Sequence, residues 1–219
     1  MEFKENVDFS RMYYGRVKVE KFHLPFTKAE IVPILADAYF HEVQLRGGNY
    51  QSGNDSQINN IAEWLAADCG RVGLLLYGTV GTGKTTLLKA ICSVINYCMK
   101  PEYGELTLDS AFSKAVNIIR AKDVVSAYQN DKDLYDRMCK VQLLAIDEFG
   151  VEAIDVKSYG NTNEPIIDLL SLRYDKQRCT MISSNLDLES IGSRYGNRLE
   201  DRFVEMFKMV AFTGNSYRR

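Results

Sequence analysis

From residue 58 onward, short apolar runs of strand length alternate with segments whose apolar residues recur on one helical face. Strands are expected at 74–77, 116–119, 141–146, 180–183 and 208–212, and helical faces at 58–65, 87–95, 124–128 and 166–170. Strands that alternate with helices are typical of βαβ crossovers, in which the strands pair in parallel. The pattern therefore predicts a three-layer α/β fold around a central parallel sheet.

The part of the chain before residue 56 has a different pattern. Residues 1–26 are polar and aromatic with no clear period, and a predicted helix follows, with a capping box at Thr27 and Glu30. Its apolar face would comprise Ile31, Leu35, Tyr39 and Val43. Pro33 is expected to kink this helix or to delay its start.

A polar stretch rich in Gly, Asn and Ser, from Gly47 to Ser56, is typical of a linker. It divides the chain into a small, mainly helical N-terminal extension (residues 1–55) and a main domain (residues 56–219). The aromatic residues of the extension fit either of two roles, which are docking of a partner and packing on the main domain. They are Phe3, Phe9, Tyr13, Tyr14, Phe22 and Phe26.

Composition excludes several classes of protein. A net charge of -2 argues against a broad nucleic-acid surface of the histone kind, and 46% hydrophobic residues are enough for a folded core. The five cysteines form no C-x-x-C pair, so we expect neither a disulfide framework nor a structural metal, but buried thiols in a reducing compartment. Because there is no secretory signal and no apolar run of about 18 residues, we expect a cytoplasmic protein without a membrane partner.

The strongest motif is the segment from Gly78 to Thr85, which matches G-x-x-x-x-G-K-[ST] between an apolar strand and an amphipathic helix. Its glycines let backbone N–H groups point at phosphates, Lys84 adds positive charge, and Thr85 offers a hydroxyl to Mg²⁺. ATP and Mg²⁺ are therefore the expected cofactors. The residues expected to bind the nucleotide are Gly78, Gly81, Thr82, Gly83, Lys84, Thr85 and Thr86.

Two carboxylates, Asp147 and Glu148, end another apolar strand. In P-loop proteins an aspartate at this place holds Mg²⁺, here together with Thr85, and the following glutamate can polarise the water that attacks the γ-phosphate. Since a small-molecule kinase needs no such glutamate, the pair favours an ATP hydrolase. The same pair disfavours an adaptor that is switched by bound nucleotide and hydrolyses little of it.

Polar residues also end a later strand. If this strand lies beside the strand of the phosphate loop, Asn185 could orient the lytic water or touch the γ-phosphate; alternatively, it caps the next helix. Further on, Arg198 and Arg202 are four positions apart and therefore project from one helical face. They form either a solvated face paired with Asp201 or Glu205, or an arginine finger for ATP in a neighbouring subunit.

These motifs, in this order, resemble the DnaC/IstB group of AAA+ ATPases, which includes helicase loaders and transposition helpers. The block from Tyr195 to Arg202 and the tail from Gly214 to Arg219, similar to the group's G-x-S-Y-R stretch, are the most diagnostic parts. The resemblance spans residues 58–219. It implies an ATP-dependent homo-oligomer that binds single-stranded DNA and delivers a replicative ring helicase.

The same resemblance assigns roles to single residues. It implies that Asn185 is the sensor-one polar residue. Arg202 becomes the first choice for the trans arginine finger and Arg198 the second. Arg218 is implied to contact nucleotide or to stabilise the tail.

Residues 121–140 fall where the group places a DNA-facing helix, and they carry both basic residues and aspartates. Tyr128 or Tyr135 could stack on bases there, or could serve packing instead. The leading hypothesis is thus a helicase loader. The nearest alternative is a transposition helper, which contacts a transposase and duplex DNA.

Overall fold

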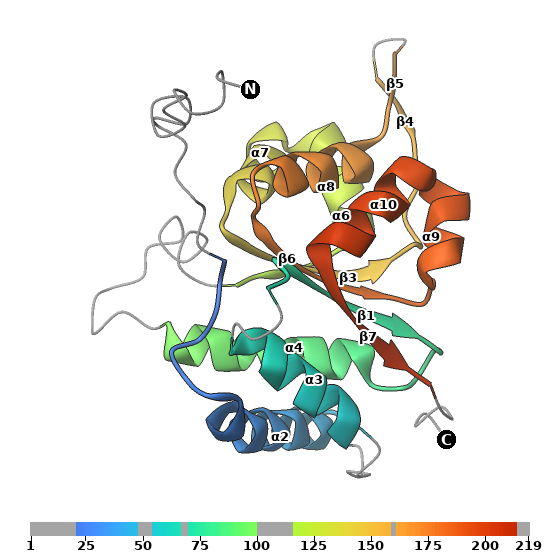
Figure 1. Cartoon of the computed structure of the whole chain (residues 1–219). Helices are drawn as coiled ribbons and strands as arrows, with labels where there is room; N and C mark the ends of the chain where they lie inside the picture. Colours follow the sequence, from blue (N-terminus) through green and yellow to red (C-terminus); the bar gives the residue numbers. More distant parts are fainter. Residues whose placement is uncertain (1–20, 48–53, 67–69, 100–115, 159–160, 214–219) are drawn as a thin grey trace, which may run out of the picture.

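The computed structural model describes residues 21–47, 54–66, 70–99, 116–158 and 161–213 (Figure 1). The C-terminal tail with Arg218 lies outside the described residues, and so do the aromatic residues of the extension before residue 21. Within the described ranges, helices and strands alternate much as the hydrophobic pattern predicts.

A five-stranded sheet forms the centre of the molecule, in the order β2-β3-β6-β1-β7. Every pairing in it is parallel, which confirms the predicted parallel sheet. Its strands are β1 (Gly73–Gly78), β2 (Ile118–Arg120), β3 (Leu143–Phe149), β6 (Cys179–Ser184) and β7 (Phe207–Phe212). An antiparallel pair that the pattern does not indicate, β4 (Val156–Ser158) and β5 (Asn161–Asn163), projects at the top of Figure 1.

Two strands, β2 and β3, differ from their predicted bounds by more than one residue at an end. The strand β2 begins later because a side chain, rather than the sheet, pairs with the backbone of Val116. The Asn96 amide donates to Val116 O at 3.2 Å and accepts from Val116 N at 2.7 Å. The strand β3 runs on to Phe149, which pairs with Ser184 after a shift in register. The acidic pair therefore lies inside the end of this strand.

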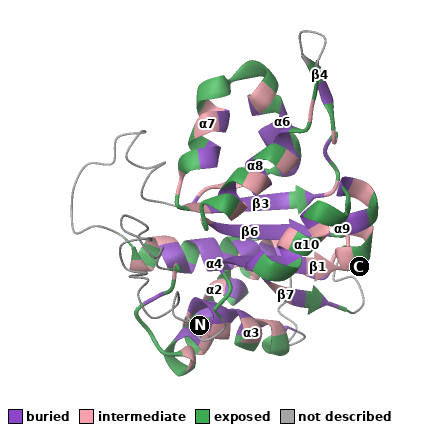
Figure 2. Cartoon of the chain, turned by 45° about the horizontal axis from the view of Figure 1, so that its top comes forward, coloured by how far each residue is buried: buried purple, intermediate pink, exposed green. Residues whose placement is uncertain are grey.

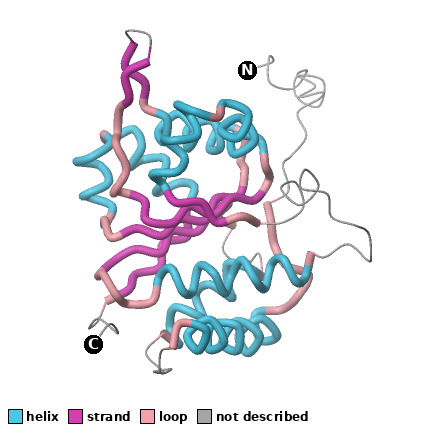
Figure 3. The backbone as a smooth tube through the Cα atoms, turned by 180° about the vertical axis from the view of Figure 1, so that it is seen from behind, coloured by secondary structure: helices cyan, strands magenta, loops and turns pink. Residues whose placement is uncertain are grey.

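Helices cover both faces of the sheet, as Figures 1 and 3 show from opposite sides. One face carries α2 (Lys28–Leu45), α3 (Asp55–Leu65) and α4 (Lys84–Cys98); the other carries α6 (Ala121–Asn130), α7 (Lys132–Lys140), α8 (Pro165–Asp175), α9 (Leu188–Tyr195) and α10 (Asn197–Met206). Figure 2 shows that the central strands between these layers are largely buried. The three-layer prediction is confirmed.

The side chains of one strand divide between two cores. Leu74 and Leu76 of β1 pack in the core with α2, α3 and α4, whereas Leu75 packs in the core on the opposite face. Successive strand residues point to opposite faces, so a strand covered on both sides must be apolar throughout. This is why the strands appear in the sequence as continuous apolar runs. Cys92 and Cys179 are buried in the first core, as predicted for thiols that act as small hydrophobic residues.

The helix α2 begins where the capping box predicts. Thr27 N donates to the Glu30 carboxylate at 2.8 Å, and Glu30 N donates to the Thr27 hydroxyl at 3.4 Å. Pro33 lies inside the helix, so the expectation that it delays the start is wrong. The helix packs against α3 and α4, and Leu35 is fully buried in their shared core. This packing stabilises a helix that proline alone would weaken. A domain boundary near residue 55 stays a prediction.

Arg173 of α8 is a fully buried cation between the layers. Its guanidinium donates to backbone carbonyls at 2.6 to 3.4 Å and to the Thr180 hydroxyl at 2.8 Å; the carbonyls belong to Met138, Val141, Gln142 and Cys179. Burial lowers its pKa to about 10, so it stays charged at neutral pH. It joins the ends of α7, β3 and β6 to α8.

Candidate nucleotide site

The phosphate-loop motif lies between β1 and α4, as predicted. Gly83 caps α4 with a φ of 91° and Gly78 has a φ of 125°, both in the left-handed region that favours glycine. A Cβ atom at Gly78 would also collide with the backbone of Phe212 on β7. The loop thus depends on glycine for its backbone path and for its close approach to the neighbouring strand.

The ammonium group of Lys84 is held over this loop. It donates to the carbonyls of Gly78 and Thr79, both at 2.7 Å, and the residue is 6% exposed. The Thr82 hydroxyl donates to Thr79 O at 2.7 Å and closes the turn. A cation at the N-terminus of a helix, beside a glycine-rich loop, is the arrangement that binds phosphate.

Asp147 is placed directly beside the loop. Its carboxylate accepts from the Thr85 hydroxyl at 2.9 Å and from the hydroxyl of Ser183 on β6, and the residue is 7% exposed. Hydroxyl and carboxylate oxygens are hard ligands, and Mg²⁺ in proteins needs only one or two carboxylates because substrate phosphates and water fill its other positions. Thr85 and Asp147 therefore fit a Mg²⁺ ion. Ser183 was not among the predicted site residues.

Glu148 follows Asp147 but differs from it in exposure and backbone. It is exposed and has a φ of 58°, which is uncommon for a residue other than glycine. Its backbone N–H donates to the Ser183 hydroxyl at 3.2 Å. Ser183 thus contacts both acidic residues and fixes the end of β3 at the site.

A cation that sequence reasoning missed lies on the same sheet edge. Arg120 pairs with Asp147 in the register of β2 and β3, and its guanidinium donates to Asp123 at 2.8 and 3.3 Å. The bond to Asp123 is the main cause that raises its pKa, and the charge of Glu148 adds to it. The acidic strand end therefore has a positive neighbour.

Asn185 follows β6, which does lie beside β1, with Tyr77 paired to Ser184. The residue is exposed, and no hydrogen bond among the described residues involves its amide. The alternative role as a helix cap is wrong, because Asp187 caps α9 and accepts from Ser190 N at 2.9 Å. Contact with a γ-phosphate stays a prediction.

The two candidate arginines lie on α10, in the other helical layer. Arg198 is exposed. The side chain of Arg202 is 15% exposed, forms an ion pair with Asp175 at 3.6 Å, and lies over the ring of Tyr174 at 5.0 Å. The predicted ion pairs with Asp201 or Glu205 are therefore wrong for Arg202, because α8 supplies its partners. In the described part of the chain, neither arginine contacts the phosphate loop of its own molecule.

A buried network connects the acidic strand end to α9. Glu152 is 3% exposed; its carboxylate accepts from Gly150 N at 2.9 Å and from the hydroxyl of Tyr195. The ring of Phe149 stacks on Tyr195 at 4.7 Å and on Phe203 of α10 at 5.6 Å. None of these residues was predicted to belong to the site. One weak signal of this network in the sequence is the Phe149-Gly150 pair that follows the two carboxylates.

The tyrosines of the segment 121–140 pack instead of presenting open rings. Tyr135 is buried and donates to Pro165 O at 2.8 Å, and its ring meets that of Tyr128 edge to face at 5.0 Å. Lys132 lies over both rings, at 4.7 and 4.6 Å. The packing interpretation is therefore confirmed for Tyr135.

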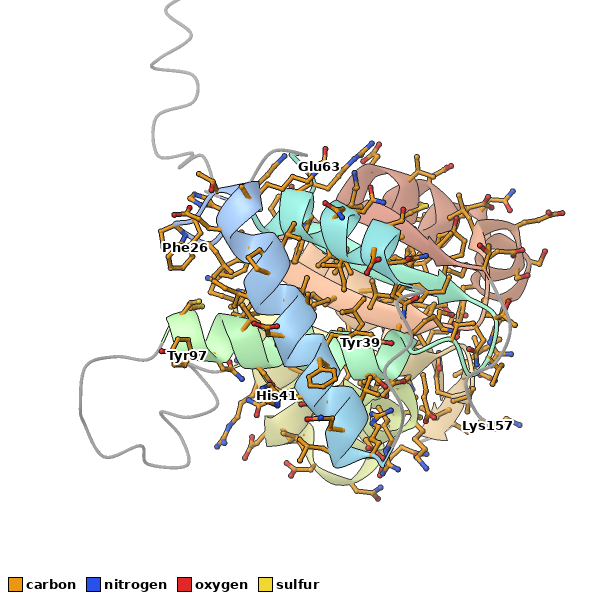
Figure 4. The ribbon with its side chains drawn as sticks, turned by 90° about the horizontal axis from the view of Figure 1, so that it is seen from below. Phe26, Tyr39, His41, Glu63, Tyr97 and Lys157 are labelled. Carbon is orange, nitrogen blue, oxygen red and sulfur yellow. The ribbon has the colours of Figure 1, made fainter. Side chains whose placement is uncertain are left out.

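Tyr39 of α2 and the cap residues Arg46 of α2 and Asn54 of α3 lie beside the phosphate loop. Arg46 donates to the Thr86 hydroxyl at 2.7 Å, and the Asn54 amide donates to the Tyr39 hydroxyl at 2.7 Å. A Cβ atom at Gly83 would lie 2.6 Å from that hydroxyl. Figure 4, a view from the side of α2, shows Tyr39 where α2 crosses α4.

None of the helices in the described ranges is long and apolar enough to cross a membrane. Among the described residues, no group of three or more His, Cys, Asp and Glu side chains could hold a metal ion. A Mg²⁺ ion at Asp147 would therefore depend on hydroxyl, phosphate and water oxygens as well.

Comparison with known proteins agrees with this geometry. The family model of the bacterial DnaA ATPase domain matches residues 38–209. No curated protein sequence matches the chain.

Several solved structures share the fold. The DnaC helicase loader is 18% identical with a TM-score of 0.55, and the match covers 75% of this chain and 92% of that one. DnaI is 19% identical with a TM-score of 0.51, covering 77% and 90%. AMPPCP-bound DnaA from Aquifex aeolicus is 20% identical with a TM-score of 0.52, covering 80% and 51%, so this chain spans about half of that protein. These similarities confirm the AAA+ fold expected from the DnaC/IstB resemblance.

Proposed function

The chain belongs to the bacterial DnaA ATPase-domain family, and from that premise we propose that it is an ATP hydrolase of DNA replication that loads a ring helicase onto single-stranded DNA. Family membership makes it a nucleotide-binding AAA+ domain. The main support for ATP hydrolysis is the hydrogen bond between Thr85 and Asp147. Their chain neighbours are Lys84, which is bonded to the phosphate loop, and Glu148, which is exposed.

Each site residue has a separate role in the proposed ATP hydrolysis. Lys84 and the first turn of α4 would bind the terminal phosphates, and Thr85 and Asp147 would hold a Mg²⁺ ion, which would neutralise phosphate charge. Glu148 is exposed, so it can reach a water molecule and accept its proton as the water attacks the γ-phosphate. The bond between the γ-phosphorus and the bridging oxygen then breaks, leaving ADP and phosphate.

The DnaC helicase loader is among the solved structures that share this fold, and this similarity supports helicase loading as the proposed role. We propose that the protein acts as a homo-oligomer in the ATP state, because Arg198 and Arg202 lie on α10, away from the phosphate loop of their own chain. Either could then stabilise transition-state charge in a neighbouring subunit.

Capture of partners by a variant that is trapped with ATP tests the proposal. Tagged Glu148→Gln protein, kept in ATP and Mg²⁺, should bind ATP, hydrolyse it much more slowly than the wild type, and recover a ring helicase from host lysate. The matched control is Lys84→Ala in the same background, which should bind no ATP and recover no helicase.

Two results would contradict the proposal at different levels. Unchanged turnover in Glu148→Gln would remove Glu148 from the chemistry. Recovery of a transposase, or of no DNA-processing protein, by a variant that holds ATP would leave the ATPase intact and reject helicase loading.

A further inference from the structure

Residues from the helices α2 and α3 and their caps contact the phosphate loop and the first turn of α4 at three points. Arg46 donates to the Thr86 hydroxyl at 2.7 Å, the Tyr39 hydroxyl lies against Gly83, and the Asn54 amide donates to Thr82 O at 3.5 Å. All three contacting residues precede the strand β1. They come from α2 and its cap and from the cap of α3, so the nucleotide site has a wall that the phosphate-loop motif does not include.

Arg46 is the charged member of this wall. Its guanidinium carries five N–H donors in a planar fork that matches phosphate oxygens. One of these donors is directed to the hydroxyl of Thr86, which lies in the first turn of α4. Among the described residues, no carboxylate lies within ion-pair distance of Arg46. Arg46 is thus an exposed cation that has no carboxylate partner in the described part of the chain, and it lies beside the N-terminus of a helix, where anions bind. It therefore has the charge and the reach of a phosphate ligand.

The position of Arg46 selects which phosphate it would contact. Thr85 bonds to Asp147 and therefore faces β3, where Mg²⁺ and the reacting phosphate belong. Thr86 is the next residue, about 100° further around α4, and its hydroxyl instead faces α2. Arg46 thus lies on the side of the loop away from Asp147, toward the part of the nucleotide that ATP and ADP share.

We propose that Arg46 is a nucleotide-binding residue whose guanidinium hydrogen-bonds a non-transferred phosphate of ATP and ADP. The inference rests on the proposed function only in that the phosphate loop binds nucleotide. Because the bond is present in both ATP and ADP, it adds uniform binding energy to the two. It also attaches α2 to the nucleotide, through the residue that caps the end of that helix.

The test is a titration of ATP, ADP and adenosine on four variants, with binding followed by calorimetry. Arg46→Ala should weaken ATP and ADP equally, by about tenfold or more, as expected for a lost hydrogen bond to a charged group. Adenosine, which lacks phosphate, should bind as it does to the wild type. Arg71→Ala is the matched control. This exposed arginine lies just before the amino end of β1, whereas the phosphate loop follows its carboxyl end, and it donates to Glu205 O. Its affinities should not change.

Two further variants separate phosphate binding from anchoring of α2. Arg46→Lys keeps the charge and should retain part of the affinity. Arg46→Gln keeps a donor for the Thr86 hydroxyl without the charge and should be as weak as Arg46→Ala. Full affinity in Arg46→Gln would show that the residue only anchors the helix, and this would overturn the inference.

The remaining outcomes are also decisive. ATP and ADP affinities of Arg46→Ala within twofold of the wild type would reject the inference and leave the proposed function standing. A loss confined to ATP would place Arg46 on the transferred phosphate and reject the assignment made here. Wild-type protein that binds neither nucleotide would reject both proposals together.

Discussion

Replacement of Tyr195 by Phe removes one hydroxyl and leaves the aromatic stack on Phe149 in place. That hydroxyl donates to the carboxylate of Glu152, whose other oxygen accepts from Gly150 N at 2.9 Å. Burial raises the pKa of Tyr195, and its bond to Glu152 raises it further, so the tyrosine remains a proton donor at neutral pH. The substitution therefore isolates a single bond to a buried acceptor.

The structure sets the size of the effect. Glu152 is 3% exposed, so water cannot easily replace the lost donor. A buried charged acceptor that loses a partner costs about 1.5–3 kcal/mol of the free energy of unfolding. For a domain of this size each kcal/mol shifts Tm by about 2–4 °C, so the expected fall is about 3–12 °C.

Urea unfolding followed by circular dichroism measures this loss, since an unchanged slope with a lower midpoint reports a change in stability alone. Tyr174→Phe is the matched control, because the Tyr174 hydroxyl also donates to a glutamate, Glu205, but at the exposed surface. The control should lose clearly less stability than Tyr195→Phe, because water can replace the partner of an exposed hydroxyl. The reasoning is refuted if the free energy of unfolding of Tyr195→Phe is within about 0.5 kcal/mol of the wild-type value, or if the variant is no less stable than the control. Burial of Glu152 would then not make its bond to Tyr195 important for stability.

Three other experiments test separate contacts. Gly83→Ala should weaken ATP binding at least about tenfold. Residue 83 has a φ of +91°, and the added Cβ would lie 2.6 Å from the Tyr39 hydroxyl. A second change of Tyr39→Phe should restore part of the affinity in the same titration. Arg173→Met should lower the free energy of unfolding by about 3 kcal/mol or more, since it leaves buried carbonyls unpaired, while ATP affinity measured by calorimetry stays unchanged. Mixing Arg202→Ala with Glu148→Gln subunits should restore part of the hydrolysis that each lacks alone, and no recovery at any ratio would reject a finger that acts between subunits.

Much of the architecture is encoded locally and could be predicted. Thr27 and Glu30 bond to each other across one helical turn, so four residues of sequence contain the whole interaction. The strand β1 is buried on both faces and therefore appears as an uninterrupted apolar run. The phosphate loop depends on glycines at fixed offsets, because its backbone path requires them. In each case the cause lies within one element.

The polar residue that faces Asp147 could not be identified in the same way. Ser183 and Asn185 are two apart, so both would point to one side if β6 continued. The strand ends at Ser184, however. Asn185 is exposed to solvent, whereas the Ser183 hydroxyl donates to Asp147. Which residue of β6 faces Asp147 depends on the pairing of β3 with β6, two strands that are far apart in the chain, and that pairing shifts its register near Phe149.

The contacts of Arg46 and Glu152 were unpredictable for the same reason. Arg46 bonds to Thr86 and Glu152 to Tyr195, each across about 40 positions of the chain. An arginine after a helix and a glutamate after a glycine are ordinary in surface loops, so neither has a local pattern that marks it. Only the packing of α2 on α4, and of α9 on the end of β3, gives these side chains their partners.

The direction of α10 bears on which arginine could act between subunits. The phosphate loop follows the carboxyl end of β1, whereas α10 leads into the amino end of β7, at Phe207. Arg202 is held by Asp175, the last residue before the turn into β6, and so lies toward the amino ends of the strands. Arg198, one turn earlier on α10, lies nearer the carboxyl ends and is exposed.

These positions predict different contacts with a neighbouring subunit. A neighbour's phosphate that approaches the carboxyl ends of the strands would meet Arg198 first. One that approaches α8 would meet Arg202, which already lies over the ring of Tyr174. Mixing experiments with each arginine replaced in turn therefore report the face by which subunits associate, as well as the residue that acts.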